Sequence, residues 1–86
     1  MHSGRIQAPD SAKKCIGRSY QDVVQEFSDA GFTQIVIEKQ DVKKGLLTKN
    51  LAISKITIKG QLQFAKGDWF EPDSLVRIIY QNIINE

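Results

Sequence analysis

The chain has 86 residues, of which 41% are hydrophobic and 26% are charged, and its formal net charge is +2. This length and composition are typical of one small globular domain and exclude a chain that is disordered over its main body. No apolar run approaches the roughly 18 residues that a membrane-spanning helix needs. The first residues also lack the apolar segment of a signal peptide. We therefore expect a cytoplasmic protein if the chain is complete.

The chain begins with a polar lead-in segment, residues 1–16, that has no clear periodicity. Residues 5–8 precede Pro9, and the position before a proline favours extended backbone, so a short extended stretch is expected there. Cys15 and His2 are the single cysteine and the single histidine of the chain, which excludes an intramolecular disulfide and a multi-histidine zinc site. A nucleophilic Cys15–His2 pair is not expected, because His2 lies in a terminal segment that tends to fray.

A helix is predicted from Ser19 to Ala30 because apolar side chains recur there at helical spacing. Ser19 is suited to cap the first turn, and Asp22 is a weaker form of the capping-box acid. Gly31 is suited to the left-handed backbone that ends many helices, and Phe32 is placed to fold back onto the last turn. The apolar stripe consists of Tyr20, Val23, Val24 and Phe27.

Three strands are predicted after the helix, from runs that are rich in β-branched residues. The connections between them are long and contain many turn residues. Ile83 and Ile84 in the tail either extend the last strand or cover a sheet edge. In chain order the predicted strands are 33–39, 53–59 and 75–80, and the connections are 40–50 and 61–74.

These elements predict an α+β domain at residues 17–82, followed by a tail at 83–86. One amphipathic helix packs on a small antiparallel sheet of about three strands, which are joined by long loops. The predicted core consists of Tyr20, Val23, Val24, Phe27, Phe32, Ile35, Ile37, Ile56, Ile58, Phe64, Val76, Ile78 and Tyr80.

Charge is unevenly distributed along the chain. Residues 38–66 carry seven lysines against two acids, a local charge of +5, whereas residues 67–86 carry one arginine against four acids, a local charge of −3. One interpretation is that the lysines solvate a loop and the outer face of a strand. The alternative is a binder of nucleic acid or of an acidic partner through the Lys39–Lys66 region, with an affinity that falls steeply with salt. The region lacks the interleaved aromatic residues of a stacking platform, which argues against nucleic acid.

The carboxylates of the chain form no catalytic or metal-binding motif. Their spacing does not distinguish them from turn formers and caps, where aspartate is common. We therefore expect no enzyme, no cofactor and no metal site. The acids considered are Asp41, Asp68, Glu71 and Asp73.

Trp69 lies in a turn-rich connection, where an aromatic ring can stack on a sugar or on a partner protein. One hypothesis is that Trp69, Lys66 and Arg77 form an exposed contact surface. The alternative is that Phe64 and Phe70 seal the core beneath the connection, and that Trp69 covers the rim of this core.

Several motifs occur together in an order that resembles a known family. They are G-x-S-Y-x-D-V-V-x-x-F-x-x-A-G-F at 17–32, a lysine-flanked Gly45, Ile58-x-Gly60-x-x-x-Phe64-x-x-Gly67-Asp68, and a closing Val76-x-Ile78-x-Tyr80 strand. Over about residues 5–82 these motifs resemble the PASTA domain, the penicillin-binding protein and serine/threonine kinase associated repeat. The chain is most similar to a PASTA-like subgroup found as C-terminal repeats of Gram-positive membrane-anchored proteins. It departs from the family at 60–64, which replaces the usual proline-glycine turn, and in its longer connection at 41–52.

The resemblance implies a non-catalytic binding or interaction module on the extracellular face of a membrane-anchored protein. A peptidoglycan fragment or a partner protein is the ligand that it implies, and it offers no catalytic residues to carry over. Exposed strand edges and the apolar Ile83–Ile84 tail also favour a homodimer as a hypothesis of its own.

Overall fold

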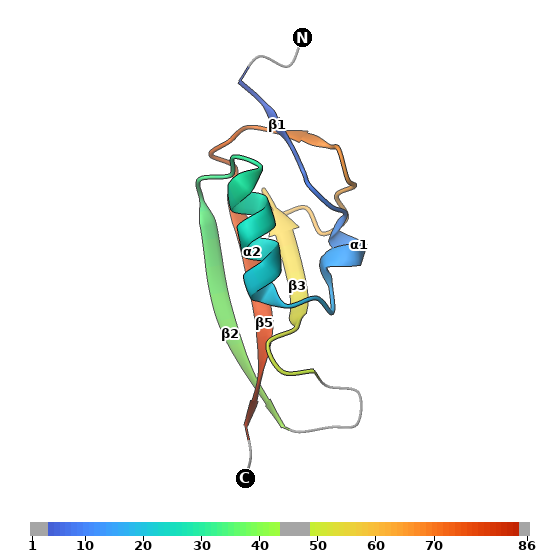
Figure 1. Ribbon diagram of the computed structural model, residues 1–86, viewed down its shortest axis with the longest axis vertical. Coiled ribbons are helices and arrows are strands. Elements are labelled where there is room, and N and C mark those ends of the chain that lie inside the picture. Colours follow the sequence, from blue (N-terminus) through green and yellow to red (C-terminus); the bar gives the residue numbers. More distant parts are fainter. Residues whose placement is uncertain (1–3, 44–48, 85–86) are drawn as a thin grey trace.

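The computed structural model describes residues 4–43 and 49–84. Helix α2 packs on a three-stranded sheet of β2, β5 and β3, while β1 and β4 form a small second sheet toward one end of the molecule (Figure 1). The expected α+β class is confirmed, with a second helix and a second sheet in addition. The elements are β1 (Ile6–Gln7), α1 (Ala12–Cys15), α2 (Tyr20–Asp29), β2 (Ile35–Lys43), β3 (Ile53–Ile58), β4 (Trp69–Phe70) and β5 (Val76–Ile84).

Helix α2 begins where it was predicted, but its start is not capped by a side chain. Ser19 occupies the N-cap position, and its hydroxyl makes no capping hydrogen bond. Its backbone instead forms a β-bridge to Ala52, and the Tyr20 N–H donates to the Leu51 carbonyl over 3.0 Å. The predicted cap is therefore wrong in its chemistry, because the segment before β3 supplies the acceptor for the helix start.

The end of α2 confirms the prediction. Gly31 has a φ of +110°, a conformation that residues with a Cβ rarely adopt. The Phe32 N–H donates to the Phe27 carbonyl over 3.2 Å, and the two rings lie 5.5 Å apart. A Cβ at Gly31 would lie 3.3 Å from Cγ2 of Ile6, so the glycine also lets β1 approach the helix end.

The sheet is mixed, which corrects the expected antiparallel arrangement. Strand β5 lies in the centre, antiparallel to β3 and parallel to β2. The 61–74 connection returns the chain to the start of β2, where the Val76 N–H donates to the Gln34 carbonyl over 2.8 Å. Val76 and Ile78 are fully buried on β5, and an apolar strand of this kind gains most from the central position.

Strands β2 and β5 are longer than predicted. Strand β2 continues through 40–43, which the sequence assigned to a loop, and it pairs with β5 from Ile35–Val76 to Lys43–Ile84. Strand β5 includes Ile83 and Ile84, so the tail extends the last strand.

The lead-in segment contributes to the core, which the sequence did not predict. Ala8, Ala12 and Cys15 are buried with the side chains of α2 and the sheet. The Ala12 N–H donates to the Phe64 carbonyl over 3.1 Å. Ser11 caps the four-residue helix α1 by accepting from the Lys14 N–H. A helix of this length shows no periodicity, so the sequence pattern could not reveal it.

Most of the predicted core is confirmed, with one correction on β2. Ile37 is 42% exposed, although it pairs with the fully buried Ile78. Strand β2 is an edge strand, and α2 lies over the centre of the sheet (Figure 1), which is consistent with the exposure of Ile37. Tyr20 and Tyr80 are partly buried and stack with their ring centroids 3.9 Å apart.

A mutation pair tests which face of α2 and β2 is buried. Phe27→Ala removes a fully buried ring and should lower the free energy of unfolding by roughly 3–5 kcal/mol. Ile37→Ala, at the uncovered edge, should cost less than about 1 kcal/mol. Urea unfolding followed by circular dichroism measures both values. Equal losses for the two variants would contradict the assigned core.

Candidate functional site

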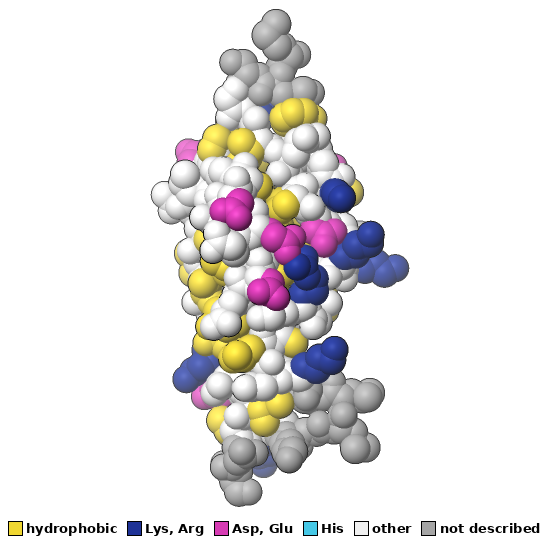
Figure 2. Space-filling model, in the orientation of Figure 1, with side chains coloured by type: hydrophobic (Ala, Val, Ile, Leu, Met, Phe, Trp, Pro, Cys, Tyr) yellow, Lys and Arg dark blue, Asp and Glu magenta, His cyan; other side chains and the backbone are white. Residues whose placement is uncertain are grey.

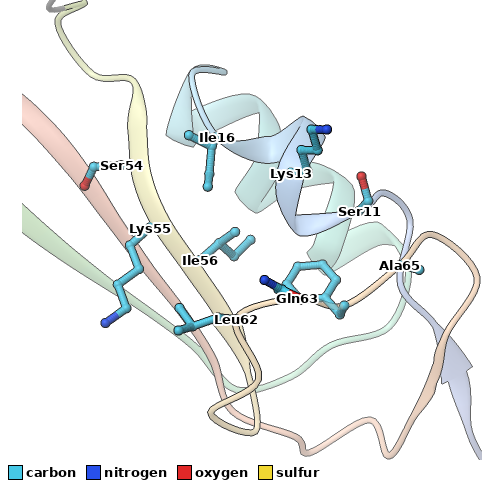
Figure 3. A pocket seen from close by; sticks show the side chains of 10 residues that line it. Ser11, Lys13, Ile16, Ser54, Lys55, Ile56, Leu62, Gln63 and Ala65 are labelled. Atoms are coloured by element: carbon cyan, nitrogen blue, oxygen red, sulfur yellow. The ribbon is translucent and has the colours of Figure 1, made fainter.

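An open groove runs along the outer edge of β3 and has a volume of about 710 Å³. One wall is α1 with its flanking residues, the other is the segment 62–65, and 54–56 of β3 lie between them (Figure 3). We call this feature the β3 groove. It brings together three segments that are far apart in the sequence.

Backbone hydrogen bonds close the β3 edge at both ends of the groove. At one end Ile53 accepts from the Gly17 N–H and donates to the Arg18 carbonyl, each over 2.9 Å. At the other end Ile58 bridges to Gln61. Because alternate residues of a strand direct their backbone groups to the same edge, Ile56 directs its N–H and C=O outward like Ile58. No described segment pairs with Ile56 there, so this part of the edge is open.

The surface of the groove is mainly apolar. Ile16 on the α1 side is 51% exposed, and Leu62 on the opposite wall is 56% exposed. Phe64 and Ile56 are buried beneath them and support the floor. Two large exposed apolar side chains border one groove. A partner that covers them gains binding free energy, because apolar surface is removed from water.

Two of the hydroxyl groups near the groove already have partners. Ser11 accepts a hydrogen bond from the Lys14 N–H over 3.3 Å. The Ser54 hydroxyl lies 3.1 Å from Oε1 of Gln40 and 3.3 Å from the Ile79 carbonyl. Polar recognition in the groove therefore rests on charge, on the Gln63 side chain and on the open backbone of β3.

The charge at the groove is positive. Lys13 and Lys55 are the charged residues among those that line it, and no described acid lines it. Neither lysine makes an ion pair within residues 4–43 and 49–84. Figure 3 shows them on opposite sides of the opening, with their side chains pointing away from each other. Uncompensated positive charge on both sides favours an anionic ligand.

The structure brings together two of the three residues predicted to form a contact surface. Lys66 and Trp69 line an open depression of about 790 Å³ next to β1, and Trp69 is 41% exposed. Phe64 and Phe70 are buried under this connection. Arg77 lies elsewhere, on the sheet face opposite α2, where its guanidinium donates to both carboxylate oxygens of Glu38 over 2.9 and 3.0 Å.

The lysines between residues 38 and 66 are divided between the two faces of the sheet. Lys39 pairs in register with Tyr80 and so points to the side of α2, where it lies 3.8 Å from Asp41. Lys55 pairs with Ile79 and points to the other side. This division does not gather the positive charge into the single stripe that a nucleic-acid backbone would follow.

Several acids considered as catalytic candidates hold local structure. Asp68 accepts from the Ala65 N–H over 2.8 Å, and Glu71 pairs with Arg5 over 3.1 Å. Asp41 accepts from the Asn82 side-chain amide over 3.0 Å. Within the described part of the chain, no group of three or more His, Cys, Asp or Glu side chains is placed to hold a metal ion.

Arg18 links the lead-in to α2 in a further cluster of charges. Its guanidinium pairs with Asp10 over 3.3 Å and also with Glu26. Figure 2 shows acidic and basic side chains meeting on the face of the molecule that carries α2. Because each charge has an opposite partner, this cluster is a structural tie between segments rather than a binding site.

Cys15 is fully buried, and burial, with a smaller effect from Asp10, raises its pKa from 9.0 to about 12. His2, the other half of the pair considered from the sequence, lies outside the described residues. A buried neutral thiol is a poor nucleophile, because the thiolate is the reactive form. Cys15 thus acts as a core residue.

Comparison of the chain with protein-family models, with curated proteins and with solved structures found no match in any of the three. No helix among the described residues is long and apolar enough to cross a membrane.

Thiol labelling tests the environment of Cys15. A pKa raised by about 3 makes the thiolate fraction about 1000-fold smaller at pH 8, so iodoacetamide should react about 1000-fold more slowly with the native protein than with the protein in concentrated urea. The raised pKa also means that the neutral thiol stabilises the fold below about pH 9, and that this contribution is lost as the pH rises toward 12. Native labelling within tenfold of the unfolded rate would contradict the buried position.

Proposed function

We propose that the chain is a non-catalytic binding module that holds an extended, acidic segment of a partner protein in the β3 groove. The observation that carries this proposal is the open β3 edge at Ile56, which lies between exposed apolar side chains and two lysines that make no ion pair with the described residues. PASTA-like membership and a position on the extracellular face of a membrane-anchored protein belong to the same proposal, and the sequence motifs support them.

An extended segment fits the groove because the open edge offers one donor and one acceptor. A peptide that adds to a strand edge gains main-chain hydrogen bonds, and its alternate side chains point to the same side. In the β3 groove those side chains would contact Ile16 and Leu62. The hydrogen bonds at Ile53 and Ile58 limit the bound segment to a few residues.

An acidic segment fits because Lys13 and Lys55 are the charges at the groove. An exposed ion pair contributes only about 0.2–1 kcal/mol. The lysines therefore contribute more to the specificity for an acidic ligand than to its affinity. Apolar contact adds roughly 25 cal/mol per Å² that is removed from water. One short groove therefore gives weak binding, and tandem copies of a repeat would raise the avidity.

A second candidate function is binding of a peptidoglycan fragment at the depression beside β1. The observation that favours it is the position of Trp69, half-exposed and next to Lys66 on the same depression. An aromatic face and a cation are suited to a sugar ring that bears a carboxylate.

A titration of the ¹⁵N-labelled protein with the peptide acetyl-Glu-Val-Glu-Val-Glu-amide tests the first function. Chemical-shift changes should centre on Ile16, Ile56 and Leu62, and the affinity should fall as salt is added. Leu62→Glu should weaken binding about tenfold, or about 1.4 kcal/mol. Leu75→Glu is the matched control, because Leu75 is also exposed but does not line the groove, and it should bind like the wild type.

Two outcomes of this titration would contradict the proposal. One is equal binding of the same peptide with lysine in place of each glutamate. The other is a set of shift changes that lies away from the β3 groove. A titration with muramyl dipeptide, followed by the fluorescence of Trp69, tests the second candidate function separately from the first. Trp69 is the single tryptophan of the chain, and only binding beside β1 should change its emission.

A further inference from the structure

The two tyrosines of the chain lie face to face, although 59 residues separate them in the sequence. Tyr20 is on the first turn of α2, which packs against β5, and Tyr80 is on β5 itself (Figure 1). Their ring centroids are 3.9 Å apart, and the angle between the ring planes is 14°. Both residues are partly exposed, so a reagent in solution has access to the pair.

Backbone contacts hold both tyrosines in this position. The Tyr20 N–H donates to the Leu51 carbonyl over 3.0 Å, at the point where α2 begins. Tyr80 lies on the central strand, in register with Lys39 of β2 and with Ile53 of β3. Because the backbone at both residues is fixed, the stacked arrangement of the rings is preorganised, and no large movement of the chain is needed to bring them together.

The hydroxyl groups of the two rings lie at the same end of the stack. Desolvation raises the pKa of Tyr80, and Tyr20 adds to this rise through its charge and through a side-chain hydrogen bond. A hydrogen bond between the hydroxyls of two nearly parallel rings also brings together the ring carbons ortho to each hydroxyl. These ortho carbons are the positions at which phenoxyl radicals form carbon–carbon bonds.

We propose that Tyr20 and Tyr80 form an oxidative modification site, at which a peroxidase that uses hydrogen peroxide converts the stacked pair to dityrosine. Each phenol gives one electron to the peroxidase and its hydroxyl proton to water, and so becomes a phenoxyl radical. The two radicals form one bond between their ortho carbons. The hydrogen on each of these carbons then moves as a proton to the oxygen of its own ring, which restores both phenols. Hydrogen peroxide takes up the two electrons and two protons and becomes two water molecules.

The stacked geometry suits this coupling step. The new bond forms between π orbitals, which extend above and below each ring, and stacked rings direct these orbitals at each other. The partial exposure of both residues leaves room for the rings to tilt as the aromatic system is restored. The product joins the first turn of α2 to the central strand by a covalent bond.

The composition of the chain makes the product easy to assign. With two tyrosines in the sequence, an intramolecular dityrosine joins Tyr20 to Tyr80. Trp69, on β4 in the second sheet, is also open to oxidation, but its oxidation adds oxygen, whereas the coupling removes two hydrogen atoms. Neither tyrosine lines the β3 groove, so the outcome of this test is independent of the peptide titration.

Peptide mapping after peroxidase treatment tests the site. The wild-type protein is treated with a peroxidase and hydrogen peroxide, and the monomer is isolated under denaturing conditions and digested with trypsin, which cleaves after Arg18, Lys39 and Arg77. Peptides 19–39 and 78–86 should appear as one species, lighter than their sum by two hydrogen atoms. Tyr20→Phe is the matched control, because it keeps the ring and removes the hydroxyl, and it should give no linked peptides. Circular dichroism confirms that this variant is folded.

Dilution of the protein distinguishes coupling within the stacked pair from coupling between two molecules. Dilution by about tenfold should leave the fraction of linked chains unchanged, because the two rings are already in contact, whereas coupling between molecules would fall about tenfold. Three results would overturn the proposal: no linked peptides from the wild-type monomer, dityrosine that occurs only in covalent dimers, or a linked fraction that falls with dilution.

Discussion

The burial of Phe27 within a cluster of aromatic rings is the interaction on which the rest of the structure depends. Phe27 has no exposed surface, and the rings of Phe32 and Phe64 lie 5.5 and 6.1 Å away. Phe64 in turn meets Phe70 edge to face at 6.4 Å. Each such aromatic pair adds about 0.5–1.5 kcal/mol to the burial of its area. The cluster therefore fixes the long connection after β3 against α2, and this connection carries Leu62 on one wall of the β3 groove.

The parts of the fold that follow local rules could be predicted from the sequence, and the parts set by distant contacts could not. The apolar stripe that ends at Phe27 predicted α2, and Gly31, with its left-handed backbone, predicted where the helix ends. The central position of β5 depends on contacts with strands that lie far away in the sequence, and no local pattern encodes it. The β3 groove was missed for the same reason, since its walls come from separate segments. The available signals were Leu62 and Ile16, two large apolar residues in polar surroundings, whereas Trp69 was selected because it lies in a turn-rich connection.

The two edges of the sheet differ in their chemistry. The β3 edge is open only between Ile53 and Ile58, and lysines flank it, which suits a short acidic segment. The β2 edge is nine residues long, with apolar residues at 35–37 and charged residues in its second half.

The central claim is that β3 is open at Ile56, and native-state hydrogen exchange of its amide tests this claim most directly. Ile53 and Ile58 donate across the same edge to the carbonyls of Arg18 and Gln61, so their amides should be protected. The Ile56 side chain is buried, yet its amide should exchange much faster than those of Ile53 and Ile58, and the acidic peptide should slow it. Protection of Ile56 equal to that of Ile53 and Ile58 in the free protein would contradict the claim.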